Sequence, residues 1–305
     1  MNRRLKLGTR GSPLALAQAS QAAAAIAAAN GWAPDAIDIV TITTTGDTVQ
    51  DRPLADIGGK ALWTKELDRA LAEGMVDLCV HSMKDVESVR PASFRLAVIL
   101  PRADVRDRLI GAASLDDLPL RAVFGTSSPR RAAQVQRVRP DLVVEPIRGN
   151  VQTRLAKIDA GEFAATLLAA AGLERLGIEA GAPLPVELIL PAPGQAAIGI
   201  ECRADDWDVG YALEAASDKP SFDCVMAERA FTRALGGTCH SPIAALANFD
   251  DFRLHLRARL YSANGDDCMA DEAHLLPGDD AVPAELARAM LSRAPPSIQQ
   301  LFDPV

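Results

Sequence analysis

The order of apolar and polar positions predicts strands and helices in alternation along the first two thirds of the chain. A strand pattern around Leu5 and Leu7 precedes Ser12 and Pro13, a good N-cap and first helical residue for a helix that ends near residue 30. A strand, a helix and a further strand are then expected in 36–44, 62–74 and 76–80. Such alternation is typical of an α/β domain whose parallel or mixed sheet is covered by helices.

A second unit of the same kind follows. The stretches "TRGSP" (9–13) and "TSSPR" (126–130) indicate one strand-to-helix junction that is used twice. Further strand-and-helix patterns occupy 141–161 and 163–177. Two α/β domains are therefore predicted, and the default ligand site of such a protein is a cleft.

The last third of the chain has a different pattern. The proline- and glycine-rich stretch 189–203 becomes strand-like and is interpreted as a segment that crosses between domains. From about residue 221 one helix, two alternating strands and a final helix are expected, in 222–237, 243–249, 252–261 and 282–293. This pattern predicts a small α+β domain at the C-terminal end.

Composition and charge narrow the function classes. The net charge of −8 argues against nucleic acid as the main partner, and no apolar run is suited to crossing a membrane. The start of the chain carries no secretory pattern. Five scattered cysteines indicate free thiols in a reducing, cytoplasmic setting, and neither they nor the four histidines show metal-ligand spacing.

Arginines stand out at the predicted strand-to-helix junctions. Arg10 precedes Ser12 in the first junction, Arg130 and Arg131 belong to the second, and "IRGNVQTR" (147–154) adds two more. Helix N-termini attract anions, and guanidinium groups hold carboxylates or phosphates in bidentate fashion. Taken together, these arginines favour local anion binding over a general basic surface.

Two further stretches carry candidate chemistry. In "VDLCVHSMKDVE" Lys84 and Asp85 come just after an apolar strand, at the sheet edge where α/β proteins bind ligands. An isolated pair of this kind also fits a solvated ion pair, whereas a carboxylate in a cleft can transfer protons or stabilise a cation. The Gly- and Thr-rich stretch 43–60 is long enough to suggest a mobile lid that ends at Lys60.

The stretch "LGGTCHSPIA" (235–244) places Cys239 in a loop of small residues. Three interpretations are open for it. The thiol can be inert and buried, it can be a nucleophile with His240 as its base, or it can carry a permanent covalent attachment. Adjacent residues rarely supply nucleophile and base geometry, and the flanking glycines would give an attached group room.

Eight segments together resemble the porphobilinogen deaminase family over essentially the whole chain. They are "LGTRGSPLAL", "GGKALWTKEL", "VHSMKDV", "GTSSPRRAAQ", "IRGNVQTRLAKID", "LAAAGLERLG", "LPAPGQAAIGIECR" and "AERAFTRALGGTCHSPIAA". Their order and spacing make the resemblance specific. One departure lies in the expected lid, where Asp56 stands in place of the lysine found in many relatives.

The resemblance implies a fold and a domain organisation. The fold would be two periplasmic-binding-protein-like (type II) α/β domains plus a small α+β C-terminal domain. Domain 1 would comprise 1–99 and 197–215, domain 2 would comprise 100–196, and domain 3, with the cofactor-bearing cysteine, would comprise 216–305.

The resemblance also implies an activity. Four porphobilinogen molecules would be condensed head to tail onto a dipyrromethane cofactor, a primer linked to Cys239 by a thioether, with loss of ammonia at each step. Water would then release 1-hydroxymethylbilane. Asp85 would be catalytic, stabilising the azafulvenium cation and moving protons. A cytoplasmic monomer with porphobilinogen as its partner, without metal, nucleic acid or membrane, is expected.

The site residues follow from the same resemblance. Cofactor binding is implied for Cys239, Lys84, Asp85, Thr126, Ser127, Ser128, Arg130, Arg131, Arg148 and Gly149. Substrate binding is implied for Arg10, Ser12, Lys60, Arg148, Asn150, Arg154, Arg175 and Gln195. Arginine suits the acetate and propionate groups of the pyrroles because its planar fork binds carboxylates in bidentate fashion.

Two alternatives from other classes stay open on the residues alone. A non-enzymatic anion-binding protein could share the two-domain architecture, although the cysteine-bearing third domain counts against it. A thiol hydrolase could use Cys239 and His240, and replacement of His240 would then abolish its activity.

Overall fold

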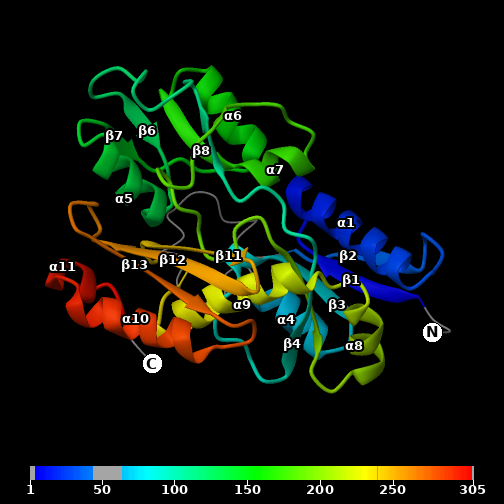
Figure 1. The fold of residues 1–305 in the computed structure, drawn as a ribbon. Coiled ribbons are helices and arrows are strands. Elements are labelled where there is room, and N and C mark those ends of the chain that lie inside the picture. The colour runs from blue at the N-terminus through cyan, green and yellow to red at the C-terminus, as the bar shows by residue number, and fades with distance from the viewer. Residues whose placement is uncertain (1–3, 44–63, 239, 304–305) are drawn as a thin grey trace. The chain divides into compact units, whose positions relative to one another are not determined.

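A computed structural model describes residues 4–43, 64–238 and 240–303. The chain divides into two compact units. The first unit consists of Met1–Ala103 and Ala196–Phe222, and the second consists of Asp104–Gln195 and Asp223–Val305. The described residues form three sheets, of five, five and three strands (Figure 1). The predicted α/β class with a small α+β part is confirmed, whereas the three domain boundaries stay a prediction.

The first unit is built on a mixed sheet with strand order β2-β1-β3-β10-β4. β1 pairs with β2 and β3 in parallel, and β10 runs antiparallel to both β3 and β4. The strands are β1 (Leu5–Thr9), β2 (Ile37–Thr41), β3 (Leu78–Ser82), β4 (Phe94–Ile99) and β10 (Ile198–Arg203). The helices are α1 (Pro13–Ala29), α4 (Lys65–Ala72), the 3₁₀ turn η1 (Met83–Asp85) and α8 (Trp207–Glu214).

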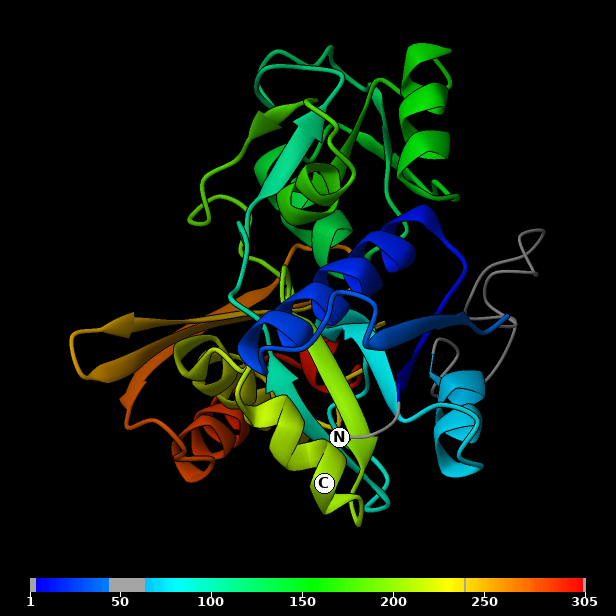
Figure 2. The ribbon, with the colours of Figure 1, turned by 90° about the vertical axis from the view of Figure 1, so that its right-hand side faces the viewer.

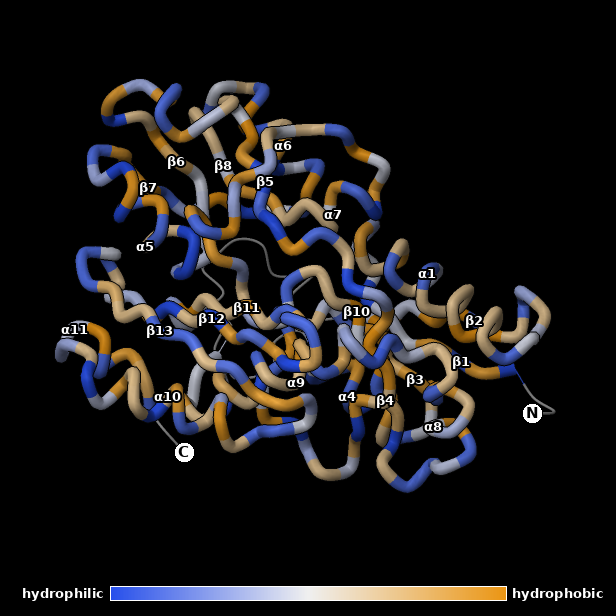
Figure 3. The backbone as a smooth tube through the Cα atoms, viewed as in Figure 1, coloured by the Kyte–Doolittle hydropathy of each residue, from blue (hydrophilic) through white to orange (hydrophobic). Residues whose placement is uncertain are grey.

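Helices cover both faces of this sheet. The small side chains of α1 and the apolar side of α8 pack on one face, around Leu7, Leu78 and Ile200. α4 lies on the other face (Figure 2). Its Leu67 and Leu71 belong to the core cluster there. Hydrophobic residues accordingly line α1, β3 and β10 (Figure 3), as expected for strands that are buried on both faces.

The second unit repeats this arrangement with other segments. Its five-stranded sheet has the order β7-β6-β8-β5-β9, and β5 again runs antiparallel to its neighbours. The strands are β5 (Asp107–Ile110), β6 (Val123–Gly125), β7 (Val143–Glu145), β8 (Ala165–Ala169) and β9 (Ala182–Pro183). The helices are α5 (Pro129–Val138), α6 (Val151–Asp159) and α7 (Ala170–Arg175). The repeated strand order fits the predicted periplasmic-binding-protein-like class.

A three-stranded antiparallel sheet completes the second unit. It consists of β11 (Ile243–Asp250), β12 (Arg253–Tyr261) and β13 (Cys268–Leu275). The helices α9 (Lys219–Ala234), α10 (Ala281–Arg293) and α11 (Pro296–Gln299) accompany it. Phe231, Leu256 and Met290 belong to the core between sheet and helices. On the opposite face Tyr261 packs near Ala133 of α5, and its hydroxyl donates to Gln134 Oε1 at 3.1 Å.

The two junctions predicted from sequence have the same local structure. Ser12 caps α1 by accepting a hydrogen bond from the Ala15 N–H, and Ser128 caps α5 by accepting one from the Arg131 N–H. A proline follows each cap, where its fixed φ suits the first helical turn. The expectation of one device used twice is therefore confirmed.

Several elements were not predicted from the pattern. β4, β5, β13 and α8 are short or carry mixed apolar and polar residues, so their periodicity is weak. Elsewhere the expected segments match and their ends differ by a few residues, as for α9, which begins at Lys219. None of the helices in the described part of the chain is long and apolar enough to cross a membrane.

Candidate active site

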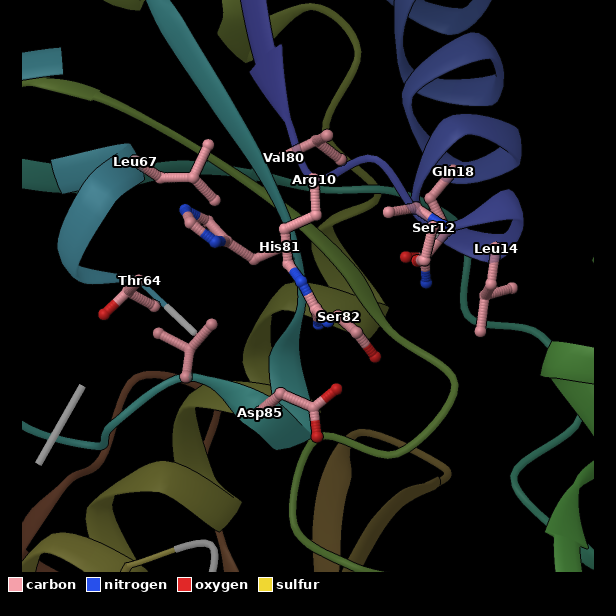
Figure 4. A pocket seen from close by; sticks show the side chains of 12 residues that line it. Arg10, Ser12, Leu14, Gln18, Thr64, Leu67, Val80, His81, Ser82 and Asp85 are labelled. Carbon is pink, nitrogen blue, oxygen red and sulfur yellow. Dashed lines mark hydrogen bonds between the residues drawn. The ribbon is translucent and has the colours of Figure 1, made fainter. Parts of the chain in front are cut away.

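A pocket opens in the first unit where β1 and β3 end. It encloses about 470 Å³, part of which is open to solvent. β1 leads into it through Arg10 and Ser12, and β3 leads into it through Ser82 and Asp85 (Figure 4). The remaining lining residues are Leu14, Ala15, Gln18, Thr64, Leu67, Val80, His81 and Val86. The pocket thus lies at the carboxyl ends of two parallel strands, the edge at which α/β proteins bind ligands.

Asp85 is held at this pocket by the residue two positions before it. The Met83 N–H donates to the Ala197 carbonyl at 3.1 Å, and the Met83 side chain is buried. Gly199 of β10 leaves the space that this side chain needs, since a Cβ there would lie 2.1 Å from Met83 Sδ. The 3₁₀ turn is therefore anchored on β10, and the half-buried Asp85 carboxylate projects from it (Figure 4).

Arg10 and Ser12 reach the pocket through the first junction. The Thr9 hydroxyl donates to the Ala15 carbonyl at 3.1 Å, which ties the end of β1 to the first turn of α1. Ser12 both caps the helix and lines the pocket. Arg10 and Ser12 thus bring a guanidinium, a hydroxyl and a helix N-terminus to the lining of one pocket, a combination that suits an anion.

Gln18 and His81 are among the pocket residues that sequence reasoning missed. Gln18 is 5% exposed, and its side-chain nitrogen has no hydrogen-bond partner among the described residues. A buried donor of this kind is costly unless a ligand or water satisfies it. The signal was a single glutamine on the buried side of an alanine-rich helix, one turn after Leu14, where an apolar residue would have been expected.

In the second unit Arg130 and Arg131 converge on one carboxylate. Asp107 is 1% exposed, and it accepts from Arg130 Nη2 at 2.9 Å and from Arg131 Nη2 at 2.7 Å. Burial opposes ionisation, but the two guanidinium groups outweigh it and hold the pKa of Asp107 well below its usual range. Gln195 completes the cluster by donating to Asp107 Oδ1 at 3.0 Å.

Thr126, Ser127 and Ser128 form the turn that leads into α5. The Thr126 N–H donates to the Glu145 carbonyl at 2.8 Å, and the Ser127 hydroxyl donates to the Ile147 carbonyl at 2.8 Å. These hydrogen bonds fix the turn against the loop after β7. The three residues of this turn that the sequence predicted therefore lie together. Some of their hydrogen-bonding groups already contact the backbone of neighbouring segments.

The loop after β7 presents the next group of predicted residues. Asn150 caps α6 by accepting from the Thr153 N–H at 2.9 Å, and Arg154 Nε donates to the Gly149 carbonyl at 3.0 Å. Gly149 has φ of 109°, a value that favours glycine. Arg148 is half-buried in the same loop. Arg175 closes α7, where burial lowers the pKa of its guanidinium.

Cys239 and Lys60 lie outside the described residues, as does the expected lid at 45–60. The loop on either side of Cys239 is described. The Thr238 N–H donates to Ser241 Oγ at 3.1 Å, and the His240 N–H donates to Thr238 Oγ1 at 3.2 Å. Gly236 has φ of 65°, and a Cβ there would lie 1.8 Å from the Asp303 carbonyl oxygen, so the loop requires glycine at that position.

The chain matches two family profiles in succession. Residues 5–210 match the one described as "Porphobilinogen deaminase, dipyromethane cofactor binding domain". Residues 222–291 match the one described as "Porphobilinogen deaminase, C-terminal domain". The two matches together span most of the chain.

Whole proteins compare in the same way. The chain is 54% identical to the porphobilinogen deaminase of Sphingopyxis alaskensis over 98% of this chain and 96% of the relative. It is 47% identical to that of Paracoccus denitrificans, over 95% of each chain. Among solved structures, the methionine-binding protein MetQ has a TM-score of 0.42 at 13% identity over 72% of this chain and 92% of that one, too distant to carry an argument.

Proposed function

Since the chain belongs to the porphobilinogen deaminase family, we propose that the pocket beside Asp85 is where its chemistry takes place. The enzyme is a transferase that joins four porphobilinogen molecules head to tail, releases ammonia at each addition and yields 1-hydroxymethylbilane for tetrapyrrole biosynthesis. Its cofactor is dipyrromethane. The cofactor supplies a pyrrole carbon to which the first substrate is joined.

Asp85 is proposed as the catalytic residue. Departure of ammonia from porphobilinogen leaves a cation that is conjugated with the pyrrole nitrogen. A carboxylate next to that nitrogen can accept its N–H and stabilise the positive charge as it develops. The half-buried position of Asp85 in the pocket supports this role, because a partly desolvated carboxylate interacts more strongly than one in water. The same oxygen atoms can receive and return a proton.

Arg10, Ser12 and Gln18 would bind the acidic side groups of a pyrrole. Arg10 and Ser12 both line the pocket, and the Gln18 side-chain nitrogen lacks a partner among the described residues. An acetate or propionate oxygen would satisfy that buried donor. This unsatisfied group is also the observation in the described structure that fits a bound pyrrole, of substrate or cofactor.

The donors of the second unit are proposed to hold the carboxylates of the cofactor and of the growing chain. They comprise Thr126, Ser127, Ser128, Arg130, Arg131, Arg148, Gly149, Asn150, Arg154, Arg175 and Gln195. Lys84, in the first unit, is also proposed to bind the cofactor. Asp107 keeps Arg130 and Arg131 in fixed orientations, so their remaining N–H groups are preorganised. Lys60 would join them from the expected lid.

Cys239 is proposed as the attachment point. Its loop follows α9 and contains Gly236 in a conformation that favours glycine. The other four cysteines, Cys79, Cys202, Cys224 and Cys268, form no disulfide bond within the described part of the chain. This supports a reducing compartment, and we propose that the enzyme works in the cytoplasm. A monomeric state is proposed from the family resemblance alone.

The observation that carries the proposal is the Asp85 turn, anchored through Met83 in the pocket that also holds Arg10 and Gln18. Intact-protein mass spectrometry tests the attachment. The purified chain should carry an adduct of two pyrrole units, which Cys239→Ala should lack and Cys268→Ala should retain. A bare chain mass in an active wild-type preparation would contradict a covalent cofactor.

Each alternative has its own test. For a thiol hydrolase, His240→Ala should abolish activity, whereas the deaminase should keep turnover and ammonia release. A non-enzymatic anion-binding protein would bind porphobilinogen without releasing ammonia. An enzyme-coupled ammonia assay on wild type and His240→Ala therefore separates the three interpretations.

A further inference from the structure

Five hydrogen bonds converge on the guanidinium of Arg90, five residues after Asp85. Arg90 Nε and Nη2 donate to the two oxygens of Glu201 at 2.9 and 2.7 Å. Nη2 and Nη1 also donate to the two oxygens of Asp68, at 2.5 and 3.1 Å. Nη1 reaches the Thr64 hydroxyl at 3.3 Å. One side chain thus binds two carboxylates, each in bidentate fashion.

These contacts connect three elements around the pocket. Asp68 and Thr64 belong to the start of α4, Glu201 belongs to β10, and Arg90 ends the segment that follows the Asp85 turn. Arg90 Nη1 also lies 3.7 Å from Glu87 in that segment. The hydrogen bonds of Arg90 therefore connect the segment that follows Asp85 in sequence to the helix α4 and to β10 of the five-stranded sheet.

Glu201 extends the connection to the pocket wall. Its Oε2 atom lies 3.2 Å from Nε2 of His81, without the alignment of a hydrogen bond. His81 lines the pocket, and its backbone pairs with Gly199, the residue that makes room for Met83. In Figure 4 the His81 ring extends towards Leu67, and the Asp85 carboxylate extends away from it. Arg90, Glu201 and His81 consequently form a continuous support behind the pocket.

On the premise of the proposed function, we propose that Arg90 is a positioning residue for the reaction at Asp85. Its guanidinium holds Glu201 behind His81 and fastens the segment after Asp85 to α4, so that the pocket wall and the catalytic turn keep one relative placement. The side chain acts through Glu201 and the backbone, not by touching substrate.

The charges explain why an arginine is needed. Glu201 is 1% exposed, and Asp68 is also largely buried, so both carboxylates need a partner. A lysine could reach one of them but could not form two planar forks. Glu201 is faced by His81 and Cys79 from β3, by Asp68 from α4 and by Arg90. Burial would raise the pKa of Glu201, but His81 and Arg90 lower it below its usual range.

This charge balance predicts a pH signature. While Arg90 is present, Glu201 stays ionised throughout the pH range in which the enzyme works. Without Arg90, Glu201 keeps His81 but loses the other group that lowers its pKa, so burial counts for more and Glu201 takes up a proton at a higher pH than in wild type. The support behind His81 then weakens as the pH falls. A variant in which Glu201 cannot ionise should lack this additional pH dependence.

The experiment compares Arg90→Lys, Arg90→Gln, Glu201→Gln and the double variant R90Q/E201Q with the cofactor-loaded wild type. Arg69→Lys, an exposed change in α4, is the matched control. We expect kcat to fall at least 10-fold in R90K and R90Q while KM changes less than 3-fold. In R90Q the loss should deepen by a further 3-fold or more between pH 8 and pH 6, and the double variant should not show this deepening.

The outcomes separate this proposal from the proposed function. A wild type without ammonia release or adduct would remove the function itself, before any variant is compared. Wild-type kcat and pH profile in both R90K and R90Q would overturn the role of Arg90. So would a loss of activity that only follows the loss of folded protein, measured by thermal unfolding. If R90Q does not fold, R90K and E201Q decide the question on the same kcat and KM criterion.

Discussion

The two strand-to-helix junctions have one backbone design and two different uses for arginine. In the first, Arg10 stands two residues before the cap Ser12 and lines an open pocket. In the second, Arg130 and Arg131 follow the cap Ser128, and they are only 3% and 6% exposed. The position of an arginine relative to the cap residue therefore decides whether its guanidinium lies at the pocket or in the interior.

The difference has a physical origin. A residue before the cap lies in the loop beyond the strand, where a ligand can approach. A residue in the first turn of the helix can turn its side chain back onto the sheet, and there Asp107 at the start of β5 receives both guanidinium groups. Similar sequence motifs thus have different surroundings. The first junction places its arginine at an open pocket, whereas the second pairs its two arginines with the buried carboxylate of Asp107.

Loss of the Asp85 carboxylate, in the pocket that Arg10 also lines, should have the largest effect on activity. In Asp85→Asn the side chain keeps its shape but can neither stabilise a cation nor take up a proton. We expect kcat for ammonia release to fall roughly 10²- to 10⁴-fold, the range for general acid–base groups. The midpoint of thermal unfolding should stay within a few degrees of wild type. Substantial turnover would remove Asp85 from its role.

Asp107→Asn tests the structural side. Two buried guanidinium groups would then face a neutral amide, and breaking a buried ion pair in this way costs about 3–5 kcal/mol. Urea denaturation should show this loss in the free energy of unfolding. Asp104→Asn is the matched control, because the side chains of Asp104 and Arg106 are 30% and 45% exposed and their pair should contribute less than about 1 kcal/mol. Equal, small effects in both variants would show that the cluster is not a structural centre.

Arg10→Gln should have the opposite profile. Loss of a charge-assisted hydrogen bond to a substrate carboxylate costs about 1.5–3 kcal/mol, which corresponds to a decrease in kcat/KM of roughly 10- to 150-fold. The free energy of unfolding should fall by less than it does in Asp107→Asn. Steady-state kinetics beside urea denaturation give both values, and Arg4→Gln, an exposed change before β1, is the control. A loss of stability without a kinetic effect would make the two junctions alike.

The smallest expected effect is the change in the stability of the folded protein at acidic pH. The pKa of Asp107 is held low in the folded chain, so its ionised form contributes stability above the usual carboxyl range, and this contribution is lost as the pH falls. Wild type should therefore approach Asp107→Asn in stability by about 1–2 kcal/mol between pH 5 and pH 3. Parallel stability curves for the two proteins over this range would contradict an ionised Asp107 as the source of the stability.

Much of the architecture could be predicted because its signals are local. Ser12 and Pro13, like Ser128 and Pro129, specify a helix start by themselves, and the apolar periods of α1 and β3 identify their buried sides. The resemblance added the position of Asp85. The structure shows a pocket beside Asp85, and the catalytic role of this residue stays a prediction. The role of Cys239 stays one too, because Cys239 lies outside the described residues.

What could not be predicted depends on contacts between distant residues. Asp107 is 23 positions from Arg130, and Arg90 is 111 positions from Glu201, so no periodicity links either pair. Gln18 was hidden by the alanine-rich composition of α1, where a polar residue on the inner side is visible only once the pocket is known. Gly199 gave no signal of its own, because its reason is the volume of the Met83 side chain.

The antiparallel strand β10 has a consequence for the order in which the protein folds during its synthesis on the ribosome. It pairs Ile198 with Ser82, so the sheet that presents Asp85 waits for more than a hundred further residues before it can be completed. The second five-stranded sheet draws all its strands from 107–183. Closing the longer loop costs more chain entropy. We therefore expect the later-encoded sheet to mature first and the N-terminal sheet to remain unfinished until translation has passed residue 203.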